Sequence, residues 1–346
     1  MGAFALGIPF ESCNFAIQAG KFTNMKKIYL LIFLMSVSIV NCQKKEAETL
    51  KINAETVVDD LEIVWGMVFL PDGSILIAEQ EGKMILFKDG KKTDIQGVPE
   101  VYYKNQGGLL DLELHPDYDS NGWIYFSFSG NLENEGKGGN TAVMRAKLKG
   151  NELTDKELIY KAVPNTARGQ HFGSRIEFDR NGYLFFSIGD RGNRDENPQD
   201  ITRDGGKIYR LMDDGSIPAD NPFASDPKAK GAIYSYGHRN PQGMAMHPES
   251  GKIWVHEHGP QGGDEINIID PGKNYGWPKI TYGKNYDDTI ITDDTDLPGL
   301  EQPLHYWVPS IAPSGMTFVT SDIYPEWKNN LLVGSLKFEY LNRVVI

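Results

Sequence analysis

A histidine and an aspartate in the middle of the chain are of the types that carry out proton transfer. His171 lies in a glycine-rich segment, residues 168–173, and its imidazole suits acid–base chemistry near neutral pH. Asp190 follows the hairpin that begins after His171. Because hairpin ends are neighbours, we expect Asp190 to accept a hydrogen bond from His171 and to fix its tautomer. The alternative is a turn histidine that faces solvent.

A second polar loop precedes the next hairpin. Arg239 and Asn240 place a cation beside an amide within the segment 236–243. This combination suits an anionic ligand such as a carboxylate, since a guanidinium binds carboxylates with two parallel hydrogen bonds. An arginine that only braces its loop is the competing interpretation.

A third loop offers oxygen ligands. Gly259 and Pro260 supply main-chain carbonyls, and the carboxylates of Asp264 and Glu265 follow within seven residues. Hard oxygen donors of this kind suit calcium, although a glycine-rich acidic turn would have the same composition. The pair His256 and His258, spaced to share one face of a strand, could indicate a transition metal, but no third ligand is evident.

These loops flank a hairpin unit that recurs along the chain. The turn glycines of the first four copies, at positions 73, 122, 182 and 251, are 49, 60 and 69 residues apart. A four-stranded propeller blade needs about 40–50 residues plus its loops. The pattern therefore predicts an all-β β-propeller, in which segments entering and leaving the inner strands meet at the central channel; a β-sandwich is the alternative. The five copies join residues 67–70 to 75–77, 112–116 to 123–126, 176–179 to 183–186, 244–248 to 253–255 and 316–319 to 331–333.

The composition supports a globular, turn-rich chain. Of 346 residues, 40% are hydrophobic, and 37 glycines and 19 prolines interrupt long helices. The net charge of −12 argues against nucleic acid and anionic membranes as partners. The only cysteines are Cys13 and Cys42, so a disulfide framework or a cysteine nucleophile is not expected in the folded body.

The N-terminal region has the pattern of a targeting segment. Met25 and two lysines precede an apolar run, residues 28–40, which has the length of an export signal. Cys42 follows at the position where a bacterial lipoprotein is lipidated. We expect residues 1–42 to be an upstream extension with an export or lipoprotein signal, and the protein to be periplasmic or held at the cell envelope, contacting the membrane only through Cys42. Residues 43–59 are a linker and residues 60–346 the propeller, C-terminally incomplete because a closed ring needs another hairpin.

The motifs taken together resemble the soluble pyrroloquinoline-quinone (PQQ)-dependent sugar dehydrogenases of the glucose/sorbosone dehydrogenase family. The resemblance covers roughly residues 60–340 in family order and implies a six-bladed β-propeller, truncated here in its last blade. The matching stretches include Gly237-His238-Arg239-Asn240-Pro241-Gln242-Gly243 and Asn274-Tyr275-Gly276-Trp277-Pro278, with residues 106–110, 115–117, 170–171, 188–190, 258–260, 264–267, 311–314 and 335–337.

The resemblance also implies roles for individual residues. His171 would be the base that takes the proton of the sugar's anomeric hydroxyl while a hydride leaves for the quinone, and Asp190 would orient it. Arg239 would stabilise charge on the reacting quinone oxygen. The remaining implied contacts are Gln106 and Gln170 to the sugar, Asn240, Gln242, Ser310 and Lys337 to PQQ, Gly259 and Pro260 to the calcium that also binds the quinone, and Glu265 and Tyr275 to a second, structural calcium.

The implied activity is oxidation of aldose sugars to lactones, with electrons passed to a separate acceptor. Gln170 stands where glucose-oxidising members tend to have Asp, which puts glucose itself in doubt as the substrate. The arginines of the final blade that clamp the cofactor would lie beyond Ile346. Two other functions remain open from the residues: a non-catalytic propeller that binds a glycan or protein, and a calcium-dependent propeller hydrolase such as a lactonase.

Overall fold

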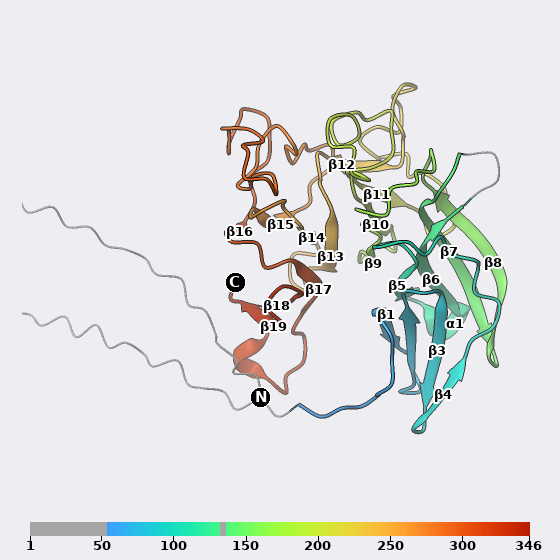
Figure 1. Cartoon of the computed structure of the whole chain (residues 1–346). Helices are drawn as coiled ribbons and strands as arrows, with labels where there is room; N and C mark the ends of the chain where they lie inside the picture. Colours follow the sequence, from blue (N-terminus) through green and yellow to red (C-terminus); the bar gives the residue numbers. More distant parts are fainter. Residues whose placement is uncertain (1–53, 132–135) are drawn as a thin grey trace, which may run out of the picture. The chain divides into compact units, whose positions relative to one another are not determined.

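The strands form five antiparallel sheets in chain order (Figure 1). The computed structural model describes residues 54–131 and 136–346. The sheets contain β1 (Val64–Phe69), β2 (Ile75–Glu79), β3 (Lys83–Lys88) and β4 (Lys91–Asp94); β5 (Leu109–Leu114), β6 (Trp123–Gly130), β7 (Asn140–Lys149) and β8 (Glu152–Lys161); β9 (Ile176–Phe178), β10 (Leu184–Ile188), β11 (Lys207–Leu211) and β12 (Ile233–Tyr236); β13 (Pro241–Met246), β14 (Ile253–Glu257), β15 (Asp264–Ile268) and β16 (His305–Trp307); and β17 (Pro313–Phe318), β18 (Leu331–Ser335) and β19 (Tyr340–Val344).

Each of the five predicted hairpins is the first strand pair of one sheet. The pairing follows the predicted turns; Phe69, for example, pairs with Ile75 across the turn that contains Gly73. The φ angles of Gly73 and Gly182, +81° and +80°, lie in the left-handed region that glycine adopts without steric cost. The only helices in the described ranges are the short α1 (Tyr118–Asn121) and η1 (Pro325–Trp327), so the sheets are joined by loops and not by crossover helices.

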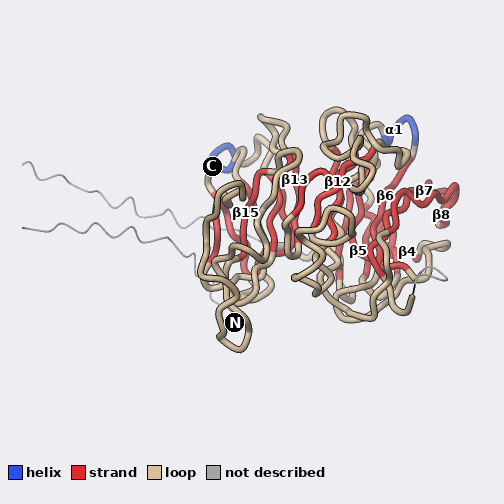
Figure 2. The backbone as a smooth tube through the Cα atoms, turned by 90° about the horizontal axis from the view of Figure 1, so that it is seen from above, coloured by secondary structure: helices blue, strands red, loops and turns tan. Residues whose placement is uncertain are grey.

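The first strands of successive sheets contact one another in the order β1, β5, β9, β13 and β17. These strands are therefore innermost, as in a propeller whose blades radiate from an axis. Viewed from above, β5, β12, β13 and β15 follow one another across the molecule (Figure 2). The all-β propeller is confirmed, with five blades among the described residues. The sixth blade stays a prediction.

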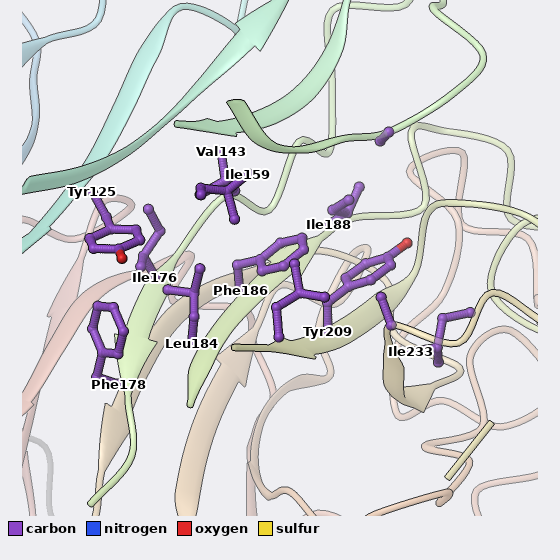
Figure 3. Close-up of a cluster of buried hydrophobic side chains, with 13 residues drawn as sticks. Tyr125, Val143, Ile159, Ile176, Phe178, Leu184, Phe186, Ile188, Tyr209 and Ile233 are labelled. Carbon is purple, nitrogen blue, oxygen red and sulfur yellow. The ribbon is translucent and has the colours of Figure 1, made fainter. Parts of the chain in front are cut away.

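Apolar side chains fill the space between neighbouring blades. Between the second and third blades, Phe186 and Tyr209 stack with ring centroids 4.8 Å apart, and Tyr125 meets Phe178 edge to face at 5.0 Å (Figure 3). Similar clusters lie between the other neighbouring blades. Such packing fixes the blades against one another, and with them the loops at their ends.

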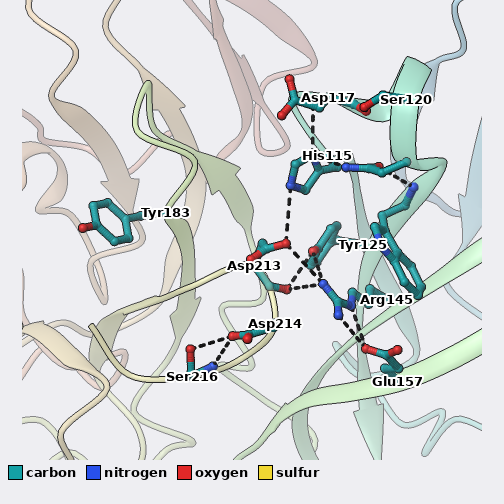
Figure 4. A network of polar contacts seen from close by, with 12 residues as sticks. His115, Asp117, Ser120, Tyr125, Arg145, Glu157, Tyr183, Asp213, Asp214 and Ser216 are labelled. Carbon is teal, nitrogen blue, oxygen red and sulfur yellow. Dashed lines mark hydrogen bonds and ion pairs between the residues drawn. The ribbon is translucent and has the colours of Figure 1, made fainter. Parts of the chain in front are cut away.

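A polar network joins the second and third blades at one end of their strands. Arg145 on β7 makes ion pairs with Glu157 and Asp213, at 2.7 and 3.3 Å, and the hydroxyl of Tyr125 donates to the main-chain oxygen of Asp213 (Figure 4). Asp213 follows the end of β11, whereas the start of β11 pairs with Ile188 beside Asp190. The network therefore joins the two blades at the end that is far from Asp190.

The predicted export signal at residues 1–42, including Cys42, lies outside the described residues. In the described ranges, no helix has both the length and the apolar character needed to cross a membrane.

Candidate active site

The predicted site residues lie in loops at one end of the blades. In an antiparallel pair the start of one strand adjoins the end of the next, as where Pro241 on β13 pairs with Glu257 on β14. The loops before the innermost strands and those after the second strands therefore converge. Gln106, His171, Arg239 and Ser310 belong to the first kind of loop, and Asp190, Gly259 and Lys337 to the second.

His171 and Asp190 are in direct contact, as the hairpin argument predicted. Nδ1 of His171 lies 2.6 Å from Oδ1 of Asp190. An ionised carboxylate only accepts hydrogen bonds, so Nδ1 carries the proton and Nε2 keeps its lone pair. Within the described residues Nε2 has no hydrogen-bond partner, and 12% of the imidazole is exposed. The imidazole can therefore accept a proton from a bound molecule.

Asp190 is held on every side, and two of its partners were not foreseen. Its carboxylate accepts the indole N–H of Trp277 at 2.9 Å and the main-chain N–H of Gly192 at 2.7 Å. Only 1% of the residue is exposed. Burial alone would raise the pKa of Asp190, but its hydrogen bonds with His171 and Trp277 and the charge of Arg239 hold that pKa below its usual value. Asp190 is thus a fixed anion.

The surroundings of His171 favour the neutral imidazole. Burial lowers the pKa of His171, the charges of Arg239 and Arg191 act in the same direction, and Asp190 opposes them without cancelling them. The residue has φ +54°, and its main-chain N–H donates to Oε1 of Gln106 at 2.7 Å. A neutral, oriented imidazole is the form that a general base needs.

Arg239 joins the pair to the fourth blade. Its main-chain oxygen accepts the N–H of Asp190 at 2.7 Å, and its guanidinium lies 5.4 Å from the centre of the Trp277 ring. One guanidinium nitrogen donates to the main-chain oxygen of His258 at 3.0 Å. Within the described residues it has no other side-chain hydrogen bond and no ion pair, so the remaining N–H groups can bind an anion.

The other residues assigned to the cofactor are held to different degrees. The amide of Gln242 donates to Asn240 at 3.2 Å and to the main-chain oxygen of Gly173 at 3.3 Å, which places both amides beside the His171 loop. Ser310 donates to Asp264 at 2.7 Å. Lys337 is exposed in the turn between β18 and β19, and its ammonium lies over the Phe338 ring.

The two residues assigned to the sugar are exposed. Gln106 contacts the His171 loop directly through the hydrogen bond given above. The side-chain amide of Gln170 lies so close to Gly192 that a Cβ on that glycine would come within 2.6 Å of it. Gln106 therefore contacts the loop of the base directly, and Gln170, the residue before His171, lies against the Gly192 turn that follows Asp190.

The predicted calcium loop presents free main-chain oxygens. In the described ranges the carbonyls of Gly259 and Pro260 accept no hydrogen bond. Asp264 is unsuited as a ligand, because its carboxylate already accepts from Gly259 N–H at 2.9 Å, Ser310 and the N–H groups of Ile311 and Ala312. It joins the calcium loop to the Ser310 loop.

Two glutamates, the buried Glu257 and the half-buried Glu265, lie behind this loop. Burial, reinforced by the charge of Glu257, raises the pKa of Glu265 to about 8, as expected where two carboxylates share a site with no cation between them. Both line one small pocket with Gly259 and Tyr275. The hydroxyl of Tyr275 donates to the main-chain oxygen of Ile268 at 2.6 Å. The main-chain oxygen of Tyr275 accepts no hydrogen bond in the described residues and is therefore the candidate ligand.

The two histidines considered for a transition metal are used otherwise. Nε2 of His258 lies 2.6 Å from the oxygen of Pro313, and Nε2 of His256 is hydrogen-bonded to the oxygen of Ser314. The two imidazoles therefore fasten β14 and the loop that follows it to β17. Within the described residues no group of three or more His, Cys, Asp or Glu side chains is arranged to hold a metal.

Fold and site together define the class of protein: an all-β propeller with an oriented, neutral base and a buried arginine that lines a small pocket near it. The family described as glucose/sorbosone dehydrogenase matches residues 61–346. Aldose sugar dehydrogenase YliI from Escherichia coli is 43% identical over 293 residues, which span 83% of this chain and 78% of that protein. The chain belongs to the glucose/sorbosone dehydrogenase family and is a sugar dehydrogenase, an oxidoreductase.

Solved structures agree with this assignment. A glucose dehydrogenase crystal structure superimposes with a TM-score of 0.81 at 41% identity, covering 84% of this chain and 86% of the other. The PQQ-bound form of an aldose sugar dehydrogenase from Streptomyces coelicolor superimposes with a TM-score of 0.69 at 29% identity, covering 84% and 80%.

Sequence reasoning assigned no role to Trp277 or Glu257, and it offered Asp264 as a calcium ligand, which its four hydrogen bonds contradict. Trp277 lies in a stretch that carried the family resemblance, Asn274–Pro278. That stretch was the one available signal for it. Nothing in the local sequence places its indole against Asp190.

Proposed function

We propose that the protein oxidises aldose sugars to lactones with PQQ as cofactor and calcium as its metal. The observation that carries this proposal is the His171–Asp190 pair, whose Nε2 is free within the described residues, together with the charge of the buried, pocket-lining Arg239 that acts on His171. Membership of the family and the PQQ-bound relative from Streptomyces coelicolor support the choice of cofactor. The sugar is a small-molecule substrate, and a separate acceptor removes the electrons.

The residues fit the proposed cofactor by charge and by free donors. PQQ carries three carboxylates, and Arg239 and Lys337 are cations with no ion pair in the described residues. The amides of Asn240 and Gln242 and the hydroxyl of Ser310 border the same loops. When bound, PQQ supplies a two-electron acceptor that takes hydride from the anomeric carbon.

The chain's own residues supply the proton chemistry. Nε2 of His171 takes the anomeric hydroxyl proton, while Asp190 keeps the opposite nitrogen protonated and stabilises the imidazolium that forms. Gln106 and Gln170 border the base and contact the sugar. Arg239 places positive charge where negative charge develops during the transfer.

Calcium would be bound by the free carbonyls of Gly259 and Pro260, and a second ion by Glu265 with the main-chain oxygen of Tyr275. The raised pKa of Glu265 supports the second site, because a divalent cation would relieve its repulsion from Glu257.

We also propose that the propeller has a sixth blade, that residues 43–59 link it to an N-terminal signal in residues 1–42, and that the protein is exported, with Cys42 as a possible lipid anchor. Large apolar side chains support the extra blade. Met67 and Phe69 on β1 are 53% and 63% exposed, and Leu341 on β19 is 50% exposed. A sixth blade packed between the first and the fifth would cover these side chains.

The test is cofactor-dependent dye reduction by the full chain across a panel of aldoses, with calcium and PQQ added. PQQ binding is followed separately by near-ultraviolet absorption. His171→Asn should leave PQQ binding intact and lower turnover by roughly 10²–10⁴, the usual contribution of a general base. His305→Asn, an exposed histidine on β16, is the control and should be active.

Each outcome discriminates between functions. Dye reduction that requires PQQ supports the dehydrogenase, and the panel names the sugar class. A folded protein that neither binds PQQ nor reduces dye contradicts the proposal and favours the binding propeller or the hydrolase. Undiminished turnover in His171→Asn removes that residue from the mechanism.

A further inference from the structure

A polar pocket lies behind the loop that carries His171. Its cavity volume is about 100 Å³, which is room for a compact group and less than a whole drug-sized ligand needs. Its walls come from segments that adjoin the base and its aspartate, since Arg168 precedes His171 and Arg191 follows Asp190. The other lining residues used below are Arg203, Asp204 and Asn197.

Arg191 is a buried cation with no counter-ion among the described residues. Only 1% of the residue is exposed, and its guanidinium lies 3.4 Å from the centre of the Phe172 ring. Its terminal nitrogens donate to main-chain oxygens, among them those of Gln170 and Arg168, and its Nε has no partner. No carboxylate in the described residues forms an ion pair with it. Burial lowers the pKa of Arg191 to about 9, the cost expected of an unpaired buried charge.

The remaining charges of the pocket leave it positive. Arg168 is exposed and has no side-chain hydrogen bond or ion pair within the described part of the chain. Arg203 forms an ion pair at 2.8 Å with Glu196, which is itself 57% exposed, and its Nε donates to the neutral amide oxygen of Asn197 at 3.1 Å. The one carboxylate in the wall, Asp204, is already engaged by Lys230 at 2.9 Å and by the hydroxyls of two tyrosines. Three guanidiniums therefore face a space whose only carboxylate is neutralised.

We propose that this pocket binds a compact oxyanion, a carboxylate or phosphate group, through Arg168 and Arg203 with Arg191 behind them. Planar guanidiniums bind such groups with charge-assisted hydrogen bonds, and an anion there would supply the counter-ion that Arg191 lacks. The anion is either free or carried by an acidic sugar. Only the second source rests on the proposed dehydrogenase function.

The experiment is calorimetric titration of the full chain, without cofactor, with inorganic phosphate and with glucuronate; neutral glucose is the control ligand. Both Arg168→Gln and Arg203→Gln should weaken anion binding at least about tenfold, as expected for loss of a charge-assisted contact. Arg194→Gln is the matched control variant. Arg194 belongs to the same loop, is 38% exposed against 39% for Arg203, and does not line the pocket. It should leave binding unchanged.

The outcomes separate the two sources and the two proposals. Tighter binding of glucuronate than of phosphate places the anion on a sugar, whereas binding of phosphate alone indicates a free ion; either supports the site. The proposal is overturned if neither anion binds saturably, or if Arg194→Gln weakens binding as much as the pocket variants do. The titration uses neither PQQ nor turnover, so its result does not depend on the outcome of the dehydrogenase assay.

Discussion

Replacing Trp277 by phenylalanine would test how the base is held. The substitution keeps a ring in place and removes the N–H that donates to Asp190 at 2.9 Å. A hydrogen bond to an ionised group contributes about 1.5–3 kcal/mol. If all of it acts on the orientation of the base in the transition state, kcat/KM falls by about 10–150-fold.

The same substitution has a defined pH effect. Trp277 helps to hold the pKa of Asp190 down, so its loss leaves a more basic carboxylate. That carboxylate binds the protonated form of His171 more strongly and raises the pKa of His171. Because the base acts only when neutral, the acid limb of kcat/KM should move to higher pH. Titration of the His171 ring by NMR in the cofactor-free protein should show the same direction.

Trp254 offers a matched control. Trp254 and Trp277 are 5% and 6% exposed, but the indole N–H of Trp254 has no hydrogen-bond partner among the described residues. Trp254→Phe therefore changes packing without removing a hydrogen bond, and the acid limb should stay in place. An unchanged limb in Trp277→Phe, or an equal shift in Trp254→Phe, would refute the role assigned to Trp277.

Three further predictions follow from the site. Without calcium, thermal stability should fall as pH rises from about 4.5 to 8, because folded Glu265, with its raised pKa, retains a proton that the unfolded chain releases. Glu265→Gln should remove both this decline and any gain in Tm on adding calcium; a calcium response that persists counts against the second ion. Gly189→Ala would place a Cβ 2.5 Å from the oxygen of His171 and 2.8 Å from Asn240, which should cost about 1–3 kcal/mol of stability and lower kcat/KM. Gly73→Ala serves as the comparison, because its Cβ would meet nothing within 4 Å. This variant should lose stability through backbone strain alone, and its kcat/KM should not change. In wild type, the acid limb of kcat/KM should lie below the usual histidine pKa, since burial lowers the pKa of His171; a limb above it would contradict a neutral base.

The amino-acid sequence by itself determined the hairpins and the closest pair in the site. Alternating strands and turn glycines such as Gly73 and Gly182 specify local pairing, because side chains alternate between faces and a positive φ favours glycine. The same local logic brings Asp190 to His171, since both flank one hairpin. The motifs that matched the family were also readable without coordinates.

The tertiary structure decided what surrounds that pair. Trp277 is 87 residues from Asp190 in the chain and reaches it only because the third and fourth blades pack together. Blade packing also saturates Asp264 with donors and leaves Glu265 near Glu257. It buries Arg191 with no counter-ion in the part of the chain that the structure describes. Periodicity and turn chemistry report short-range pairing. Which distant side chain completes the hydrogen bonds of a buried charge depends on how whole sheets meet, and that lies beyond the reach of local sequence.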